Sequence, residues 1–381
     1  MAPAPVPIPV ARPLIEEQDI EAVTRVLRSG WLSTGEECER LEADLARVTG
    51  AAHAIGVSSC TAALELAFRS LRLSPGARVG VPTWTFVASA LAPRSTGAVP
   101  VLLDVDPRTL NLSPDAVEAA LPSLDALVVV HFGGAPVDRR IFDLAAAAGV
   151  PVVEDAAHAL GTIDHRGPMA GRGTVGACFS FYATKNITSG EGGALVTDDA
   201  EVAAFCRSQR LHGVSADAWA RYRPGAKRGY DLVEPGLKAN LPDVLAALAR
   251  SQLARLDDVQ ARRRELVGSY HELLSSVAGL ELVPGEVDQR SADHLMVVLL
   301  PSGRDRDEVA ARLADHGIGT SVHFQPLHRF SWFATHAEVG PSGLDGADAV
   351  ADRALSLPLH SGLELEDVER VSTALRDALG S

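Results

Sequence analysis

Between about residues 14 and 200, short apolar runs alternate with segments that carry apolar residues at helical spacing. This alternation limits the possible folds more than any other feature, because short apolar runs suit strands and longer periodic segments suit helices. Residues 126–130 contain no polar side chain at alternate positions, which is typical of a strand covered on both faces. The order of the segments predicts an α/β fold with a mostly parallel central sheet flanked by helices.

The pattern places expected elements along the whole chain. Helices are expected at 17–28, 37–48, 62–71, 87–95, 113–121 and 137–148, and strands at 54–57, 78–81, 99–104, 126–130 and 151–154. Farther on, helices are expected at 242–276, 305–316 and 364–378, and strands at 294–299 and 319–323. Residues 213–236 interrupt the pattern and are expected to form a long loop. We expect an N-terminal arm and a large domain over 1–250, and a smaller C-terminal α/β domain over 251–381.

Charge and composition exclude several classes of function. The 381 residues carry a formal net charge of −14, from 35 basic and 49 acidic residues. Such a surface repels phosphate backbones, so we expect no nucleic-acid partner. No stretch approaches the ~18 apolar residues of a membrane span, so we expect no contact with a membrane. The four cysteines lack paired spacing and the N-terminus lacks a signal-peptide core, which predicts a reduced, cytoplasmic protein with no metal site.

One glycine-rich segment imitates a dinucleotide-binding motif. Residues 171–176 match G-x-G-x-x-G, but that fingerprint follows a buried strand and precedes an acidic residue about 20 positions on. Here the preceding residues 165–170 read as a turn. We therefore interpret the segment as a glycine-rich loop.

The chain has only three lysines, Lys185, Lys227 and Lys238, so chemistry that needs an amine has three candidates. Lys185 lies among aromatic and small residues in the segment 179–186. Desolvation there lowers the pKa of an amine and makes it a nucleophile able to form a Schiff base. The alternative is an ordinary surface lysine with its stem along apolar neighbours.

Two further segments complement this lysine. Asp155 ends an apolar run, where ligand sites of open α/β sheets lie, although an Asp there can also cap a helix. The turn 58–61 presents hydroxyls and free N–H groups, which suit a phosphate or an ordinary helix cap. With the aromatic Phe86, these parts match what pyridoxal phosphate needs: a phosphate cradle, a stacking ring, a carboxylate beside the ring nitrogen and a lysine for the aldehyde.

The sequence resembles the DegT/DnrJ/StrS family of sugar aminotransferases, which are fold-type-I pyridoxal phosphate enzymes. The resemblance extends from about Pro13 to the C-terminus. The matching segments are 29–35, 59–64, 82–89, 154–161 and 179–186, which read SGWLSTG, SCTAAL, PTWTFVAS, EDAAHALG and FSFYATKN.

The resemblance implies a role for each matching position. Lys185 forms the Schiff base, Asp155 pairs with the ring nitrogen and His158 lies near the phenolic oxygen of the cofactor. Phe86 stacks on the ring, whereas Trp84 is expected to pack in the interior. By the same resemblance, the cofactor phosphate is bound by Ser59, Cys60, Thr61 and Ser180. Cys60 departs from the glycine that the family commonly has there, which matters little if only its N–H is used.

The resemblance also predicts a partner subunit and a substrate pocket. Residues 236–241, GLKANL, match a stretch that reaches the neighbouring subunit's cofactor phosphate, through Lys238 or Asn240. This Lys-x-Asn version looks like the branch that forms 4-amino-4-deoxy-L-arabinose nucleotides. A homodimer with composite active sites is therefore expected. Candidate substrate contacts are Trp31, Tyr182, Arg210, His212, His323 and His328, with Arg223, Lys227 and Arg228 near the diphosphate. Each histidine or arginine has an ordinary structural or surface role as its alternative.

The leading hypothesis is a transaminase that converts a nucleotide-linked keto-sugar, a 4-keto-pentose or 4-keto-6-deoxyhexose, with glutamate as donor and pyridoxamine phosphate as the intermediate cofactor form. The arginine-rich composition suggests a GC-rich bacterium and antibiotic biosynthesis. The runner-up is an aminotransferase for a cyclitol or aminoshikimate-type ring. A dehydratase of the same fold has His at the position of Lys185, and a non-catalytic regulator would lack Lys185 or Asp155, so both are disfavoured.

Overall fold

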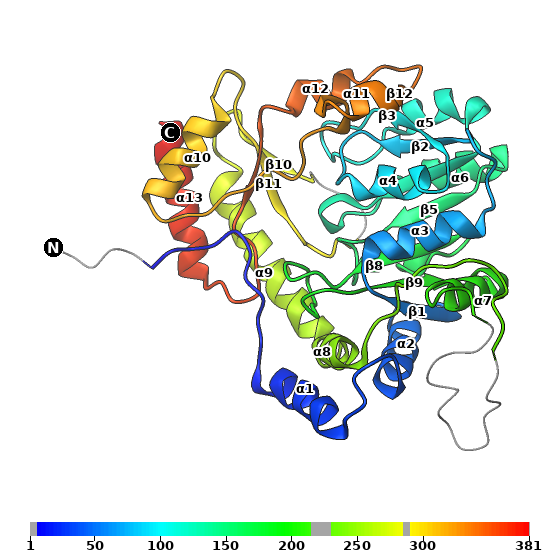
Figure 1. Cartoon of the computed structure of the whole chain (residues 1–381). Coiled ribbons are helices and arrows are strands. Elements are labelled where there is room, and N and C mark those ends of the chain that lie inside the picture. The colour runs from blue at the N-terminus through cyan, green and yellow to red at the C-terminus, as the bar shows by residue number, and fades with distance from the viewer. Residues whose placement is uncertain (1–5, 215–229, 285–289, 381) are drawn as a thin grey trace.

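The computed structural model describes residues 6–214, 230–284 and 290–380 (Figure 1). The helices are α1 (Glu17–Ser29), α2 (Glu36–Thr49), α3 (Cys60–Ser70), α4 (Ala88–Arg94), α5 (Pro114–Ala120), α6 (Arg139–Ala148), α7 (Ala200–Gln209), α8 (Asp243–Leu253), α9 (Leu256–Leu274), α10 (Arg306–Asp315), α11 (Phe333–His336), α12 (Asp345–Val350) and α13 (Leu365–Leu379). The strands are β1 (His53–Val57), β2 (Arg78–Pro82), β3 (Val99–Leu103), β4 (Ala126–Val130), β5 (Val152–Asp155), β6 (Ile163–Asp164), β7 (Gly167–Pro168), β8 (Gly176–Ser180), β9 (Gly193–Thr197), β10 (Glu281–Val283), β11 (Met296–Leu299), β12 (Glu338–Val339) and β13 (Ala354–Leu357). Within these ranges no helix is both long and apolar enough to cross a membrane.

The central sheet has eight strands in the order β1-β9-β8-β5-β4-β2-β3-β12. Only β9 runs against the others, since it pairs antiparallel with both β1 and β8 while the remaining pairs are parallel. This confirms the predicted mostly parallel α/β sheet. The carboxyl ends of β1, β2, β5 and β8 therefore lie at one edge of the sheet, where parallel sheets place their ligands.

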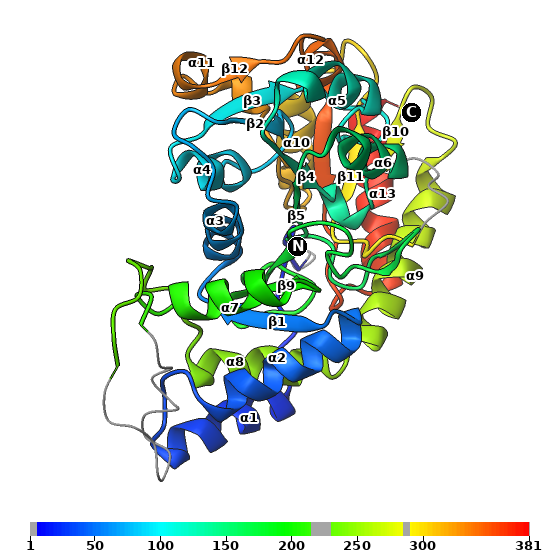
Figure 2. The same cartoon turned by 90° about the vertical axis from the view of Figure 1, so that its right-hand side faces the viewer.

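Strand β4 shows why its sequence lacks polar alternation. Val128 and Val130 pack with the α3 side of the core, whereas Leu127 and Val129 pack with the α5 and α6 side. Figure 2 shows α3 and α6 on opposite faces of the sheet. Each fully buried Val or Leu side chain contributes about 1.5–3 kcal/mol relative to exposure, so both faces stabilise the layer.

The C-terminal part forms a smaller antiparallel sheet of β10, β11 and β13. Its core includes side chains of α9, α10 and α13, together with Ile8 from the N-terminal arm. Figure 1 shows this part beside the central sheet, with α8 and α9 leading into it. Strand β12 returns to the edge of the central sheet and pairs with β3. The division of the chain near residue 250 stays a prediction.

The structure corrects two expected elements and leaves one undescribed. The helix expected at 242–276 is two helices, because Arg255 has non-helical φ and ψ and pairs with Glu16 and Asp19 of the α1 region. The strand expected at 319–323 is only a single bridge at Ser321, and β13 takes the place beside β11. Residues 215–229 of the loop expected at 213–236 lie outside the described residues.

Helix α2 begins through a contact with a residue far along the chain. Gly35, at its N-cap position, has no side chain to accept the first helical N–H groups. Asp243, the first residue of α8, supplies the carboxylate instead: it accepts from the backbone N–H of Gly35 at 2.7 Å, Cys38 at 3.1 Å and Glu37 at 3.2 Å. This buried carboxylate thus joins α2 to α8.

We expect Asp243→Ala to lower the free energy of unfolding by about 2–3 kcal/mol, because three helix N–H groups lose their acceptor in a buried place. Urea unfolding followed by circular dichroism measures the change. Asp257→Ala, which removes an exposed carboxylate in the first turn of α9, is the matched control and should stay within about 0.5 kcal/mol of the parent. An Asp243→Ala variant as stable as the control would contradict the bridging role.

Candidate active site

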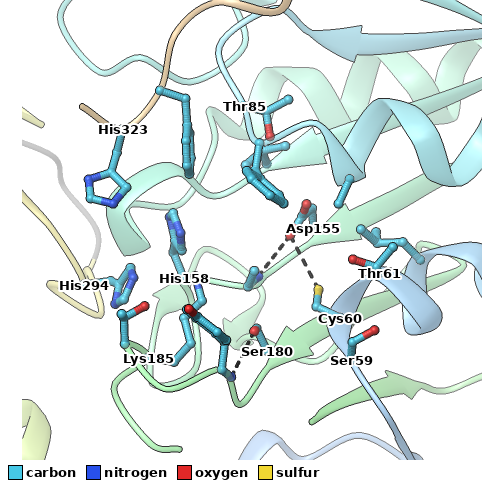
Figure 3. Close-up of a pocket in the computed structure, with 18 of the residues that line it drawn as sticks. Ser59, Cys60, Thr61, Thr85, Asp155, His158, Ser180, Lys185, His294 and His323 are labelled. Atoms are coloured by element: carbon cyan, nitrogen blue, oxygen red, sulfur yellow. Dashed lines mark hydrogen bonds between the residues drawn. The ribbon is translucent and has the colours of Figure 1, made fainter. Parts of the chain in front are cut away.

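A cavity of about 520 Å³ lies at the carboxyl edge of the central sheet (Figure 3). Its walls come from the start of α3, the turn after β2, the ends of β5 and β8, and two segments of the C-terminal part. Ten of the residues proposed from the sequence line it: Ser59, Cys60, Thr61, Phe86, Asp155, His158, Ser180, Tyr182, Lys185 and His323. The parallel strands thus bring together segments that are far apart in the sequence.

Asp155 is the last residue of β5 and its carboxylate is fixed by neighbours. The Ser89 hydroxyl donates to Oδ2 at 2.7 Å, and the Ala157 N–H donates to Oδ1 at 3.1 Å. The Cys60 thiol lies 3.8 Å from Oδ1. Turns follow β5 in place of a helix, so Asp155 does not cap one. Its side chain is 6% exposed and lines the cavity.

Lys185 lies in the turn after β8, where its N–H donates to the Tyr182 carbonyl at 2.9 Å. Burial lowers the pKa of its amine to about 8, although the nearby Cys60 and Asp155 favour the charged form. An amine with this pKa is largely available as a nucleophile in mildly alkaline solution. The half-buried side chain and its lowered pKa agree with the desolvated lysine expected from the sequence.

The start of α3 provides an anion site. Ser59 caps the helix by accepting from the Ala62 N–H at 3.1 Å. The next two amides, of Cys60 and Thr61, donate to no atom within the described ranges, as expected at a helix N-terminus. Gly193 allows the close approach here, since a Cβ on it would lie 2.5 Å from the Cys60 nitrogen. Ser180 adds a hydroxyl on the cavity wall.

Imidazole and phenyl rings form the opposite wall (Figure 3). The His158 ring stacks against the Phe324 ring with centroids 5.9 Å apart, and the centroid of the His294 ring lies 4.4 Å from that of His158. The Gly133 N–H donates to His158 Nδ1 at 3.3 Å, so the proton of the neutral ring is on Nε2. Burial, followed by the charge of Lys185, lowers the pKa of His158 well below its usual value and that of His323 to about 4. The wall is polar and largely uncharged.

Four proposed substrate contacts do not line the cavity of this chain. The Trp31 indole donates to the Thr34 carbonyl at 3.2 Å. Arg210 is buried, where its guanidinium bonds Glu42 and donates to the Gly56 carbonyl at 2.8 Å. His212 is exposed in a turn, and His328 bonds Thr83 and Asp348 at 2.8 and 3.1 Å. Arg223, Lys227 and Arg228 lie outside the described residues.

Lys238 and Asn240 lie beside the end of β1, also away from the cavity lining. The Lys238 amine donates to the Asn240 carbonyl oxygen, and the Asn240 amide donates to the Thr34 hydroxyl at 2.6 Å. The Lys238 side chain is exposed. Their predicted role toward a neighbouring subunit stays a prediction.

The sequence reasoning missed several residues of the site. Ser89 was part of a matching segment without a role, yet it is the hydroxyl that holds Asp155. His294 and Phe324 come from the C-terminal part, and both line the cavity. His294 begins an apolar run with no motif around it, so no sequence signal pointed to it. Trp84 is fully buried and its indole donates to the His323 carbonyl at 3.2 Å, which confirms its predicted packing role.

The sequence of this chain is similar to those of known aminotransferases. The model of the DegT/DnrJ/EryC1/StrS aminotransferase family matches residues 13–376. The spore coat polysaccharide biosynthesis protein SpsC of Bacillus subtilis is 41% identical, over 97% of this chain and 96% of that protein. The UDP-4-amino-4-deoxy-L-arabinose–oxoglutarate aminotransferase of Shewanella sediminis is 38% identical, over 98% of each chain.

Solved structures that are similar to this chain are also named aminotransferases. The aminotransferase TlmJ from Streptoalloteichus hindustanus has a TM-score of 0.89 and 35% identity, and the alignment covers 98% of this chain and 99% of that one. The sugar aminotransferase Spr1654 from Streptococcus pneumoniae, described as putative, is solved in a PMP form and a PLP form at 28% identity, with TM-scores of 0.89 and 0.88. Each alignment covers 98% of this chain and 99% of the other.

The residues of the cavity fit pyridoxal phosphate. The free amides of Cys60 and Thr61 suit its phosphate, the fixed carboxylate of Asp155 suits a protonated ring nitrogen, and the amine of Lys185 suits its aldehyde. Phe86 supplies an aromatic face on the cavity wall. These assignments agree with the sequence predictions.

We expect covalent attachment of pyridoxal phosphate to Lys185 to rise with pH through a midpoint near 8 and to level off above about pH 9, because the neutral amine is the attacking form. Apoprotein incubated with the cofactor, reduced with borohydride and mapped by peptide mass measures the labelled fraction. A lysine of ordinary basicity continues to gain label up to about pH 10. Lys185→Ala is the control and should lose the label. A label confined to Lys227 or Lys238 contradicts the assignment.

Proposed function

We propose a substrate for this chain, which belongs to the DegT/DnrJ/EryC1/StrS aminotransferase family and is a pyridoxal-phosphate-dependent sugar aminotransferase. The proposed reaction is amination of C4 of a nucleotide-linked keto-sugar with glutamate as donor. The observation that carries this proposal is the 38% identity, across 98% of both chains, to a protein named for UDP-4-amino-4-deoxy-L-arabinose and oxoglutarate. A 4-keto-pentose is the first choice of substrate and a 4-keto-6-deoxyhexose the second.

The bound cofactor supplies an electron sink that stabilises negative charge at the carbon from which a proton is removed. The chain's own residues make that chemistry possible. Asp155, held by Ser89 and the Ala157 N–H, keeps its carboxylate in one orientation, which favours the protonated form of a ring nitrogen placed against it. The amides at the start of α3 hold an anionic group at the other end.

Lys185 carries the proton transfer. Its amine has a pKa of about 8, so near neutral pH it can both release a proton and accept one at Nζ. A group whose pKa lies near the working pH serves best as a general acid and base. The aromatic and imidazole side chains of the cavity wall reduce the contact of this amine with solvent.

A homodimer with composite active sites is part of the proposal. Two aromatic side chains of the cavity, Phe86 and Tyr182, are 57% and 48% exposed in the single chain, and exposed aromatic residues are enriched where proteins associate. Lys238 lies exposed on the segment that leads into α8. We propose that Lys238 or Asn240 reaches the cofactor phosphate of the partner subunit, which makes the interface necessary for activity.

The substrate proposal predicts that the pyridoxamine form returns to the pyridoxal form fastest with a 4-keto sugar nucleotide. Stopped-flow absorbance with a panel of ketones gives kcat/KM for each one. A missing methyl group changes binding by only ~1–3 kcal/mol, so the pentose and the 6-deoxyhexose should differ by no more than about 200-fold. A strong preference for a 3-keto sugar or for a free cyclitol ketone would overturn the proposal.

The dimer proposal predicts complementation between two inactive chains. Lys185→Ala removes the nucleophile, and the double variant Lys238→Ala, Asn240→Ala removes the groups offered to the partner. Mixed chains should regain activity, because one hybrid site then holds Lys185 together with an intact partner segment. Differently tagged chains, co-expressed and purified on both tags, guarantee mixed dimers. A doubly tagged species without activity, or a parent enzyme that sediments as an active monomer, contradicts the composite site.

A further inference from the structure

His294 reaches the cavity on a segment that a buried arginine holds in place. Arg263 of α9 is only 3% exposed. Its guanidinium donates to the carbonyls of Asp293 and His294, each at 2.7 Å, and to that of Leu359 at 3.1 Å. These bonds fix the backbone of His294, so its ring has a defined position on the cavity wall.

The bonds of the His294 ring determine which nitrogen carries the proton. The Asn186 amide nitrogen donates to the Ala292 carbonyl at 2.7 Å, so the Asn186 oxygen is the atom left to accept. That oxygen lies 2.9 Å from His294 Nδ1, which must therefore carry the proton. The other ring nitrogen, Nε2, then has a free lone pair whenever the ring is neutral.

Protonation of this ring is opposed by its surroundings. Burial, followed by the charges of His158, Lys185, Arg263 and His323, lowers the pKa of His294 well below its usual value. His294 Nε2 bonds no atom of the described residues, and the ring lines the cavity beside His158. His158 bears its proton on Nε2, so the two adjacent rings differ: one offers a donor and the other an acceptor.

We propose that His294 Nε2 accepts a hydrogen bond from a hydroxyl group of the sugar, which makes His294 a specificity-determining residue of this site. The inference rests on the proposed function. The carboxylates of the amino donor offer only acceptors, and its amino group is the one that reacts with the cofactor, so none of these groups is left to pair with the Nε2 lone pair. His294 therefore serves the half-reaction that consumes the keto-sugar and not the half-reaction that consumes glutamate.

Two substitutions separate the acceptor from the positioning bond. In His294→Asn the side-chain amide stays near the place of Nδ1, so it can still donate to Asn186 while the Nε2 acceptor is lost. In His294→Gln the side-chain oxygen reaches the place of Nε2, so the acceptor is kept. We expect His294→Asn to lower kcat/KM of the sugar half-reaction about tenfold, with the glutamate half-reaction within about twofold of the parent. His294→Gln should keep most of the sugar half-reaction.

Deoxy analogues of the sugar identify the hydroxyl. The analogue that lacks it should react equally well with the parent enzyme and with His294→Asn, because neither can form the bond. Calorimetric binding of the amino-sugar product to the pyridoxal form gives a second readout, with about tenfold weaker binding to His294→Asn. Equal losses in both half-reactions, or a His294→Gln variant as poor as His294→Asn, would overturn the inference.

If the proposed function is wrong, the experiment gives a result that differs from failure of the His294 inference. In that case the parent enzyme itself converts none of the nucleotide-linked ketones. The variants are then compared on whichever hydroxylated ketone the parent does accept, and the same contrast between the two half-reactions is expected. Absence of that contrast overturns the role of His294 whichever ketone is the substrate.

Discussion

The common direction of β1, β2, β5 and β8 is the constraint on which the site depends. Parallel strands end at the same edge, so the turn after each strand is placed there whatever its distance along the chain. Helix α3 begins after β1 with its free amides at this edge, and Asp155 ends β5 beside them. The single reversed strand, β9, allows the turn that carries Lys185 to fold back against the same edge.

A second network holds Asp155 from the opposite face of the sheet. The preceding residue, Glu154, is fully buried and pairs with Arg166 at 2.7 Å and with His131 at 3.0 Å. Burial alone raises the pKa of Glu154, but the hydrogen bonds and charges of His131 and Arg166 keep it at about 2. Because neighbouring side chains of a strand point to opposite faces, this ionic cluster fixes the end of β5 while Asp155 faces the cavity.

Residue patterns predicted correctly the elements that meet apolar side chains along their whole length. They failed where a contact with a residue distant in the sequence determines where a helix ends or which strand pairs with which. The strand at 126–130 was correct because both of its faces meet apolar side chains. The break at Arg255 depends on carboxylates of the α1 region, and the place of β13 beside β11 depends on tertiary packing. Likewise, Lys185 and Asp155 stand in local motifs, whereas His294 is held in the site by hydrogen bonds to residues distant in the sequence, Arg263 and Asn186 among them.

The residues suited to the cofactor and the residues of the opposite cavity wall come from different parts of the fold. This difference affects how the substrate of such a site can change. The groups suited to the cofactor stand at the ends of sheet strands and at the start of α3, where the whole core fixes them. His294, His323 and Phe324 stand on connecting segments of the C-terminal part. Segments outside strands and helices tolerate replacement better than the sheet does. We infer that substitutions on these segments can alter the sugar while the proton chemistry at Lys185 stays the same.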